Sequence, residues 1–148
     1  SDTLDRTGVI IPGMKGAHIP GMLEVTKAAQ KFVGEIEQEI PDYSATKING
    51  VPRYKLARKG EAMERKSKMV TIHSLNIDEI VDNKIIFTAT VSSGTYIRQL
   101  SYDIFKSLGI ESYLESLTRT QIGDYDLSKC AKIKDFISDN WKSTVTMF

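Results

Sequence analysis

The spacing of apolar residues early in the chain predicts a helix that follows a loop. The helical spacing is carried by Val25, Ala28, Ala29, Phe32 and Val33, and Gly34 can end that helix. The preceding segment, Ile11 to Gly21, holds two prolines and three glycines, a composition typical of a loop. Residues 40–54 are turn-rich, and a short helix from about Arg53 to Lys59 ends at Gly60.

The middle of the chain changes its hydrophobic period from two to 3.6. Met69 to Ile77 alternates and is rich in β-branched residues, Asp82-Asn83 is typical of a turn, and Lys84 to Val91 alternates again, which predicts a β-hairpin. Beyond it, a helix from Tyr96 to Leu108 ends at Gly109. Its apolar face consists of Ile97, Leu100, Ile104 and Leu108.

The last third of the chain predicts smaller elements. Glu111 to Leu117 is expected to form a short helix, and Arg119 to Leu127 an irregular strand. Ser128 is expected to cap a last helix, whose buried face consists of Cys130, Ile133, Phe136 and Ile137. The fold class predicted from this order is α+β: a mixed, mostly antiparallel sheet with flanking helices.

Length and composition narrow the class of protein. A chain of 148 residues with 26% charged residues is expected to fold as one domain with a core. We find neither an apolar run long enough to span a membrane nor a signal peptide at SDTLDRTGVI. One cysteine, Cys130, cannot form an internal disulfide, and two histidines, His18 and His73, cannot complete a zinc site with it. We therefore expect a cytoplasmic protein without a metal, in which both histidines are structural or exposed.

Positive charge is concentrated in one segment. Residues 47–68 contain eight basic residues and only two acidic ones, Glu61 and Glu64, whereas the whole chain carries a net charge of +1. Two interpretations fit this cluster: a surface for a phosphate-rich partner such as nucleic acid, or a charged face that is only solvated.

Three motifs occur in a specific order and spacing. They are Tyr43-Ser44-Ala45-Thr46-Lys47 continuing to Gly60, Ser93-Gly94-Thr95-Tyr96-Ile97-Arg98, and Leu117-Thr118-Arg119-Thr120 with Gly123. Together they resemble the TruB family of tRNA pseudouridine synthases, over about Ile36 to Tyr125. The resemblance implies part of a pseudouridine synthase fold, conversion of the T-loop uridine 55 of tRNA to pseudouridine, and no cofactor.

The position of the catalytic aspartate departs from the family pattern. The family's nucleophile lies in a GxLDPxATGxL segment, and the segment around Asp5 lacks its glycine and alanine and is two residues short. Residues 1–9 instead fit, without a gap, a downstream TDTxDxxG segment. We therefore expect residues 1–148 to be the C-terminal portion of the catalytic domain, with the nucleophile upstream of Ser1, no clear C-terminal RNA-binding appendix, and no activity of this chain alone. Asp5 as nucleophile is the alternative.

The resemblance also implies roles for individual residues. Arg98 would pair with the catalytic aspartate and keep it ionised in a site closed to water. Tyr96 and Leu117 would line the pocket for the extruded base. Ordinary core packing is the alternative for both residues, and for Leu117 it is compatible with the role. Lys47 would lie by the cleft, and Tyr43 would pack beneath it or anchor its turn.

The partner implied is the T arm of tRNA. Its phosphates would contact Arg53, Lys55, Arg58, Lys59, Arg65, Lys66 and Lys68. Two alternatives remain: an RNA-binding module without activity, or a solubilising basic surface that binds nothing. If these residues are a fragment, part of the sheet is missing and one edge strand is left unpaired. We therefore also expect the fragment to self-associate through that edge.

Overall fold

The computed structural model of the chain describes residues 1–12 and 20–131. It divides into two compact units, Ser1–Ser116 and Leu117–Phe148, and each unit is described by itself. Within the described residues, no helix is both long enough and apolar enough to cross a membrane.

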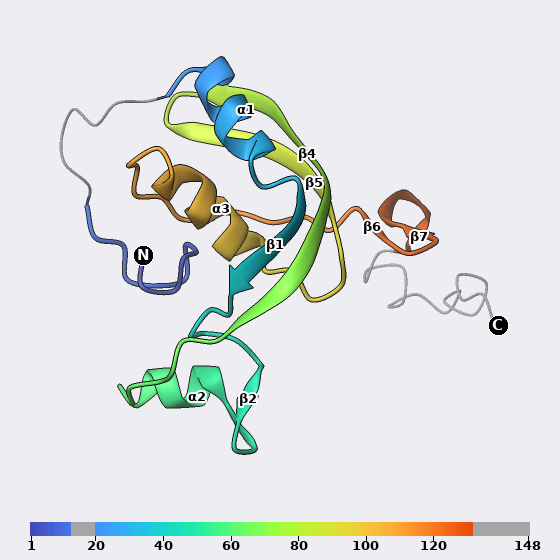
Figure 1. Cartoon of the computed structure of the whole chain (residues 1–148). Helices are drawn as coiled ribbons and strands as arrows, with labels where there is room; N and C mark the ends of the chain where they lie inside the picture. Colours follow the sequence, from blue (N-terminus) through green and yellow to red (C-terminus); the bar gives the residue numbers. More distant parts are fainter. Residues whose placement is uncertain (13–19, 132–148) are drawn as a thin grey trace. The chain divides into compact units, whose positions relative to one another are not determined.

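A three-stranded antiparallel sheet is the centre of the first unit (Figure 1). Its order is β1 (Gly34–Glu39), β4 (Ser67–Val81) and β5 (Lys84–Val91). The predicted hairpin is confirmed: β5 has the expected bounds, β4 is longer at both ends, and Asp82 adopts the left-handed conformation, φ 54°, in the connecting turn.

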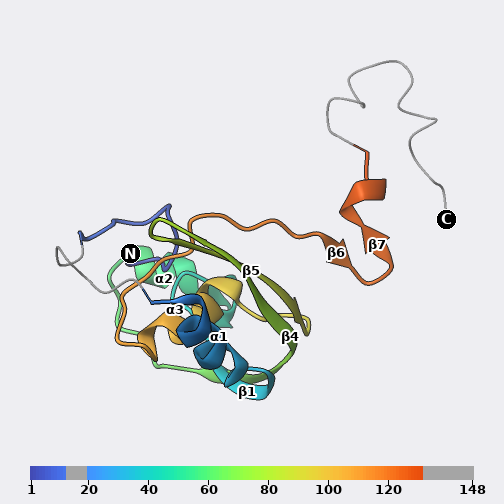
Figure 2. The ribbon, with the colours of Figure 1, turned by 90° about the horizontal axis from the view of Figure 1, so that it is seen from above.

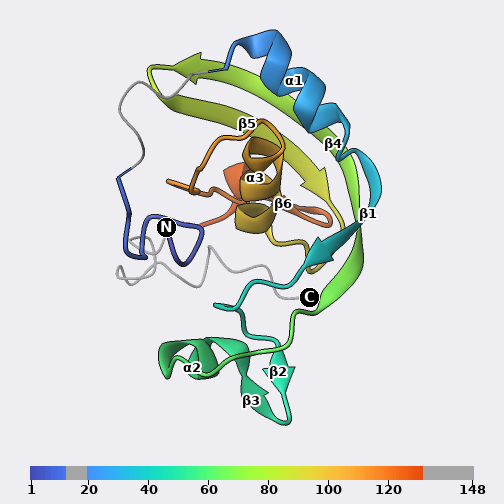
Figure 3. The same ribbon diagram turned by 60° about the vertical axis from the view of Figure 1, so that its left-hand side comes forward.

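Two irregularities in β4 keep its apolar residues on one side of the sheet. Pairing with β5 shifts register between Ile72 and Ser74 and again between Ile77 and Glu79. Each shift adds a residue to β4, so the inward positions step by three at Ile72–Leu75 and at Ile77–Ile80. Because bulges also bend a strand, β4 curves, and the sheet has a concave side (Figure 3).

Helices α1 (Met22–Gln30) and α3 (Ile97–Lys106) complete the core of this unit (Figure 2). The buried cluster consists of Ala28, Ala29, Val70, Ile72, Leu75, Leu100 and Ile104. The helix predicted over Tyr96 to Leu108 is confirmed, with Gly109 at φ 72° where it stops. The first predicted helix is also present, but it ends before Phe32 and Val33.

Strand β1 was not predicted from the sequence. Its segment, GEIEQE, has a single aliphatic side chain, Ile36, and acidic residues at the exposed positions. Pairing with β4, from Gly34 opposite Ile72 to Glu39 opposite Ser67, makes it a strand. The glycine expected to end the preceding helix is therefore the first residue of this strand, with φ 112°.

An insertion between β1 and β4 carries the turn-rich motif. Two short strands, β2 (Lys47–Ile48) and β3 (Val51–Pro52), pair with each other and lead into α2 (Arg53–Arg58). The predicted short helix over Arg53 to Lys59 is confirmed to within one residue.

The helix predicted over Glu111 to Leu117 is wrong. Leu114 instead forms a parallel bridge with Asp5. Its backbone N–H donates to the carbonyl of Leu4 at 2.9 Å, and its carbonyl accepts from the N–H of Arg6 at 3.1 Å. These bonds to the N-terminal segment replace the hydrogen bonds that a helix would form.

In the second unit, Gln121–Ile122 (β6) and Tyr125–Asp126 (β7) form a small hairpin where one irregular strand was predicted. A 3₁₀ helix, Leu127–Lys129 (η1), follows. Asp126, not Ser128, is its cap, since its carboxylate accepts the N–H of Ser128 at 2.7 Å. Cys130 is exposed, so its prediction as a core residue is wrong. The predicted helix positions Ile133, Phe136 and Ile137 lie outside the described residues.

The observed helices and mostly antiparallel strands confirm the predicted α+β class.

Candidate functional site

The carboxylate of Asp5 is held by hydrogen bonds from its own loop. Its Oδ1 accepts the Thr3 hydroxyl at 2.9 Å, the Thr7 N–H at 2.9 Å and the Thr7 hydroxyl at 2.6 Å. Leu4, at φ 62°, gives the loop the sharp turn that brings these donors together. In the sequence Thr-x-Asp-x-Thr, the two threonines therefore hold the aspartate carboxylate in one orientation through local hydrogen bonds.

These hydrogen bonds determine the ionisation of Asp5. Partial burial alone would raise the pKa of its carboxyl group. Hydrogen bonds from the Thr7 side chain and backbone, from Thr3 and from Arg98 outweigh that effect and lower the pKa to about 2. Asp5 therefore stays ionised even in mildly acidic solution, where an ordinary aspartate begins to take up a proton.

Arg98 approaches Asp5 from the first turn of α3. Its Nη1 donates to Asp5 Oδ2 at 3.2 Å, and both side chains are about one-fifth exposed, at 21% and 22%. Its Nη2 donates to the backbone carbonyl of Tyr43. Its Nε is shielded from solvent and has no hydrogen-bond partner among the described residues. The guanidinium is thus fixed on two sides, and its Nε–H stays unpaired.

A cavity of about 570 Å³ lies at this ion pair. It is lined by the N-terminal loop, the YSA segment, α2 and α3, through Asp2, Thr3, Asp5, Thr7, Gly8, Val9, Tyr43, Ser44, Ala45, Tyr54, Arg58 and Arg98. The Arg58 guanidinium lies over the Tyr54 ring, 5.5 Å from its centroid. Of the predicted site residues, the cavity brings together Tyr43, Arg98, Arg58 and the alternative nucleophile Asp5.

Tyr96 lies outside this lining, although it is only two residues from Arg98. Its hydroxyl is 2.9 Å from the Thr46 hydroxyl, and the Lys68 ammonium lies 4.7 Å from the centre of its ring. The side-chain amide of Gln38 bonds its backbone: Gln38 Nε2 donates to the Tyr96 carbonyl at 3.1 Å, and the Tyr96 N–H donates to Gln38 Oε1 at 2.8 Å.

Two further predicted residues do not line the cavity. Lys47 is exposed on β2, and Leu117 is exposed in the second unit, which is described separately. Their roles at the site stay predictions.

The basic segment does not present all its cations to solvent. Arg53 is only 1% exposed: its Nη2 donates to Asp42 at 2.5 Å, and its Nη1 donates to the Glu64 carbonyl at 3.0 Å. The prediction that Arg53 contacts RNA phosphate is therefore wrong, because its donors face the protein. Lys68 is also engaged, since its ammonium donates to the carbonyl of Gly94.

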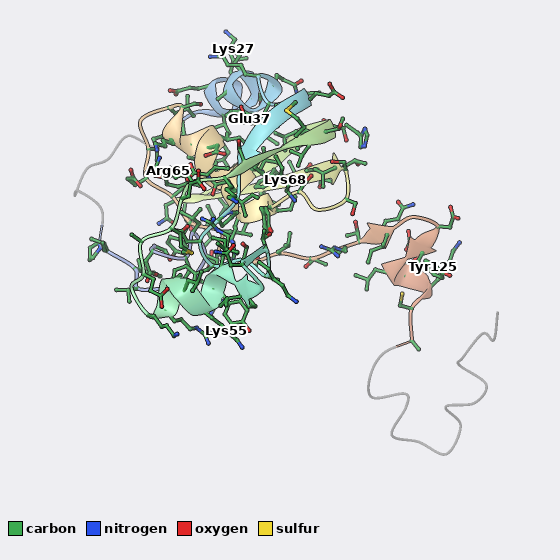
Figure 4. The ribbon with its side chains drawn as sticks, turned by 60° about the horizontal axis from the view of Figure 1, so that its bottom comes forward. Lys27, Glu37, Lys55, Arg65, Lys68 and Tyr125 are labelled. Atoms are coloured by element: carbon green, nitrogen blue, oxygen red, sulfur yellow. The ribbon has the colours of Figure 1, made fainter. Side chains whose placement is uncertain are left out.

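The remaining basic residues are exposed. Lys55, Arg58 and Lys59 lie along and just after α2, and Figure 4 shows Lys55 on the outer side of that helix. Arg65 and Lys66 precede β4, with Arg65 3.6 Å from Glu39. These five residues keep their prediction as phosphate contacts.

Sequence reasoning missed Gln38, Thr3 and Thr7. The threonines flank Asp5 at i−2 and i+2, a spacing that favours local side-chain hydrogen bonds. Gln38 had no such signal, because the strand that buries it was not predicted. His73 is exposed on β4, and His18 lies outside the described residues. In residues 1–12 and 20–131, no cluster of three His, Cys, Asp or Glu side chains could hold a metal ion.

Solved structures show that this fold occurs elsewhere. The chain superposes on one chain of a crystal structure of a Cbf5–Nop10–Gar1 complex with a TM-score of 0.63 and 23% identity. The match covers 80% of this chain and 31% of that one. At this identity the likeness concerns the fold alone.

Sequence comparisons are more specific. Proteins named tRNA pseudouridine synthase B are similar in Nitrosococcus oceani, with 43% identity over 112 residues, and in Flavobacterium johnsoniae, with 42% over 119. These matches cover 76% and 80% of this chain, but only 36% and 52% of the relatives. The relative from Aquifex aeolicus is 35% identical over 140 residues, 93% of this chain and 48% of its own length. The chain thus spans about a third to a half of the relatives it matches.

Residues 1–97 match the model for the N-terminal domain of TruB family pseudouridylate synthases. That range contains Asp5, the YSATK motif and Gly94-Thr95-Tyr96, and Arg98 follows directly. With this match over most of its length, the chain belongs to the TruB family of pseudouridylate synthases.

Proposed function

We propose that the protein containing this chain converts a uridine in the T arm of tRNA, the T-loop uridine 55, to pseudouridine in the cytoplasm. The observation that carries this proposal is Arg98, a permanent cation fixed between Asp5 and the Tyr43 carbonyl at the wall of a cavity. The family membership and the names of the relatives support the substrate.

The reaction sets the chemical requirements of the site. The bond between uracil N1 and ribose C1′ breaks, the base turns, and C5 bonds to C1′. The proton on C5 is lost and N1 gains one, so the reaction consumes no oxidant or reductant. A carboxylate that attacks or abstracts a proton must stay ionised in a site that excludes water, and a fixed guanidinium favours the ionised form. Arg98 is suited to this role.

Asp5 is suited to holding Arg98 rather than to reacting. Three hydrogen bonds occupy its Oδ1 and the guanidinium occupies its Oδ2. A carboxylate whose pKa is lowered to about 2 is also a weak base. We therefore propose that the nucleophile is a second carboxylate, from a part of the protein outside these 148 residues, and that the unpaired Nε of Arg98 adds a donor for that site.

The RNA surface would combine charge with a base pocket. The exposed cations of α2 would contact phosphates of the T arm, giving affinity and salt dependence. The extruded uracil would enter the cavity, which Tyr43 lines. Tyr96 and Lys47, which lie outside that lining, are proposed as further residues for the base on the family pattern, and for Leu117 the role is proposed from the motif alone.

The test measures tritium release from tRNA labelled at uracil C5. We expect release with the intact protein, none with residues 1–148 alone, and weak residual release with intact Asp5→Asn. Release by residues 1–148 that disappears completely in Asp5→Asn would make Asp5 the nucleophile and contradict this assignment. No release by the intact protein from any tRNA would contradict the proposed function.

A second candidate function applies to residues 1–148 alone: an RNA-binding module without activity. It is favoured because Asp5, the carboxylate paired with Arg98, has hydrogen-bond donors on both its oxygens. Salt-sensitive tRNA binding by this chain without tritium release is its expected signature.

We also propose that residues 1–148 self-associate through strand β5. Among the described residues, β5 pairs with β4 only, so one of its edges is unpaired. Its eight residues include a single charged side chain, Lys84, at the start, and a long apolar edge favours pairing with another strand.

A further inference from the structure

The start of α3 lacks the usual side-chain cap. Tyr96 is the N-cap residue, and its own side chain makes no capping hydrogen bond. Its carbonyl accepts the N–H of Leu100 at 3.0 Å, the bond expected of an N-cap residue. The Gln38 amide, 58 positions earlier, bonds both the N–H and the carbonyl of Tyr96. A buried strand residue therefore fixes this helix start from outside.

The burial of Gln38 strengthens its hold on Tyr96. Gln38 is 1% exposed, so water does not compete for its hydrogen bonds. An amide that donates and accepts with the same residue fixes both the position and the direction of that backbone. Leaving either partner unsatisfied in this environment costs free energy.

Lys68 acts on the same turn from the neighbouring strand. Gln38 and Lys68 are directly opposite in the β1–β4 register, so their side chains point to the same face. The Lys68 ammonium bonds the Gly94 carbonyl and lies over the Tyr96 ring. Gly94 has φ 80°, a backbone conformation that L side chains rarely adopt, so the turn favours glycine.

We propose that the cross-strand pair Gln38 and Lys68 positions the Gly94–Tyr96 turn, and through it the Tyr96 ring and the Arg98 guanidinium. Lys68 is then a positioning residue and not a phosphate contact. Arg98 lies two residues after Tyr96, in the first turn of α3, so a shift of the turn moves the guanidinium relative to Asp5. The consequence for catalysis rests on the proposed function, whereas the geometric part does not.

The first experiment separates positioning from phosphate binding in the intact protein. The control for Lys68→Met is Lys55→Met, which also removes one lysine, an exposed one on α2. The control for Gln38→Met is Gln30→Met. The Gln30 amide donates to the Leu75 carbonyl at 3.1 Å, away from the turn. We expect Gln38→Met and Lys68→Met each to lower kcat at saturating tRNA at least tenfold, with Kd and its salt dependence unchanged. Lys68→Arg should recover part of the loss, because guanidinium also donates and lies over rings.

The double variant tests whether the two residues act as one unit. If they do, Gln38→Met combined with Lys68→Met lowers kcat by much less than the product of the single losses. Normal kcat with weaker, less salt-dependent tRNA binding in Lys68→Met would overturn the proposal and make Lys68 a phosphate contact. Independent, multiplying losses would overturn the joint role.

The second experiment does not depend on activity. A 3-fluorotyrosine placed at position 96 reports the surroundings of the ring by ¹⁹F NMR. We expect its resonance to move in Gln38→Met and in Lys68→Met and to stay in place in Gln30→Met and Lys55→Met. If the intact protein isomerises no uridine but the resonance moves as expected, the proposed function fails and the positioning stands. An unmoved resonance in both test variants would overturn the positioning.

Discussion

Arg98 Nη1 donates to Asp5 Oδ2 at 3.2 Å, across 93 positions of sequence. One partner belongs to a loop held together by threonine hydroxyls, and the other to the first turn of a helix in the core. The pair therefore joins the N-terminal segment to α3. It also explains how the arginine of the GTYIR motif keeps one orientation at the cavity wall.

We expect the Asp5–Arg98 pair to stabilise the fold in a pH-dependent way. The pKa of Asp5 is lowered from 3.8 to about 2, so its contribution is complete above about pH 4 and is lost as the pH falls towards 2. At pH 7, Asp5→Asn should lower the free energy of unfolding by about 1–2 kcal/mol, after allowing for partial exposure. Urea unfolding between pH 2.5 and 7 measures this difference. Asp124→Asn, at an exposed turn, is the control. If the difference in unfolding free energy between the wild type and Asp5→Asn stayed constant across this pH range, it would contradict a stabilising role of the ionised Asp5.

Arg98 should affect turnover far more than tRNA affinity. In the intact protein, Arg98→Ala leaves the proposed nucleophilic carboxylate in a water-poor site without its cation. The cost of breaking a buried ion pair is about 3–5 kcal/mol. We expect Arg98→Ala to be nearly inactive and Arg98→Lys to lose at least about a hundredfold in kcat, or ~2.7 kcal/mol of barrier. Single-turnover tritium release and tRNA binding are measured together. Normal turnover with weaker binding would instead mean that Arg98 holds phosphate.

The exposed cations of α2 should supply affinity. Lys55→Ala with Lys59→Ala is expected to weaken tRNA binding and to reduce the slope of its salt dependence by about one for each phosphate that is no longer neutralised. The charge-matched control is Lys27→Ala with Lys31→Ala. Lys27 lies on α1 and Lys31 directly follows it, and Figure 4 shows Lys27 far from Lys55. Equal effects in both pairs would indicate a non-specific response to net charge.

Arg53 should matter for stability and not for RNA binding. Its buried guanidinium ties Asp42 and the Glu64 carbonyl together, so Arg53→Met leaves that carbonyl without its donor. We expect a loss of about 2–3 kcal/mol in the free energy of unfolding, typical of a missing hydrogen bond to a charged group with an unsatisfied partner left behind. Thermal melting of Arg53→Met beside exposed Arg65→Met measures it. Unchanged melting with weaker tRNA binding would restore Arg53 as a phosphate contact.

The unpaired edge of β5 should cause association of residues 1–148. Ile86, 50% exposed on that strand, is the position at which a charge would oppose strand pairing. We expect sedimentation to show concentration-dependent association that Ile86→Lys abolishes. Met69→Lys, on the central strand β4 and 64% exposed, is the control, because it adds the same charge away from the edge. A monomer at high concentration, or association that disappears only in Met69→Lys, would contradict pairing through β5.

Local signals in the sequence sufficed for several elements. The hairpin around Asp82-Asn83 and the helix ending at Gly109 were predicted because alternation, helical spacing and turn residues act over short distances. The motifs containing Tyr43 and Arg98 likewise indicate the family without the fold, since each is a short segment of the sequence.

Tertiary structure alone decided the rest. β1 is a strand because it pairs with the edge of β4, although the sequence GEIEQE has little strand character. That pairing brings the buried Gln38 side chain to the backbone of Tyr96. Leu114 is extended because the backbone of the N-terminal segment takes its hydrogen bonds. Arg53 and Lys68 have the same charge as their exposed neighbours, yet they turn their donors to carbonyls of the protein. These hydrogen bonds join segments far apart in the chain, so no local pattern records them: the residue types were set by the sequence, and their roles by which backbone groups came within hydrogen-bond distance.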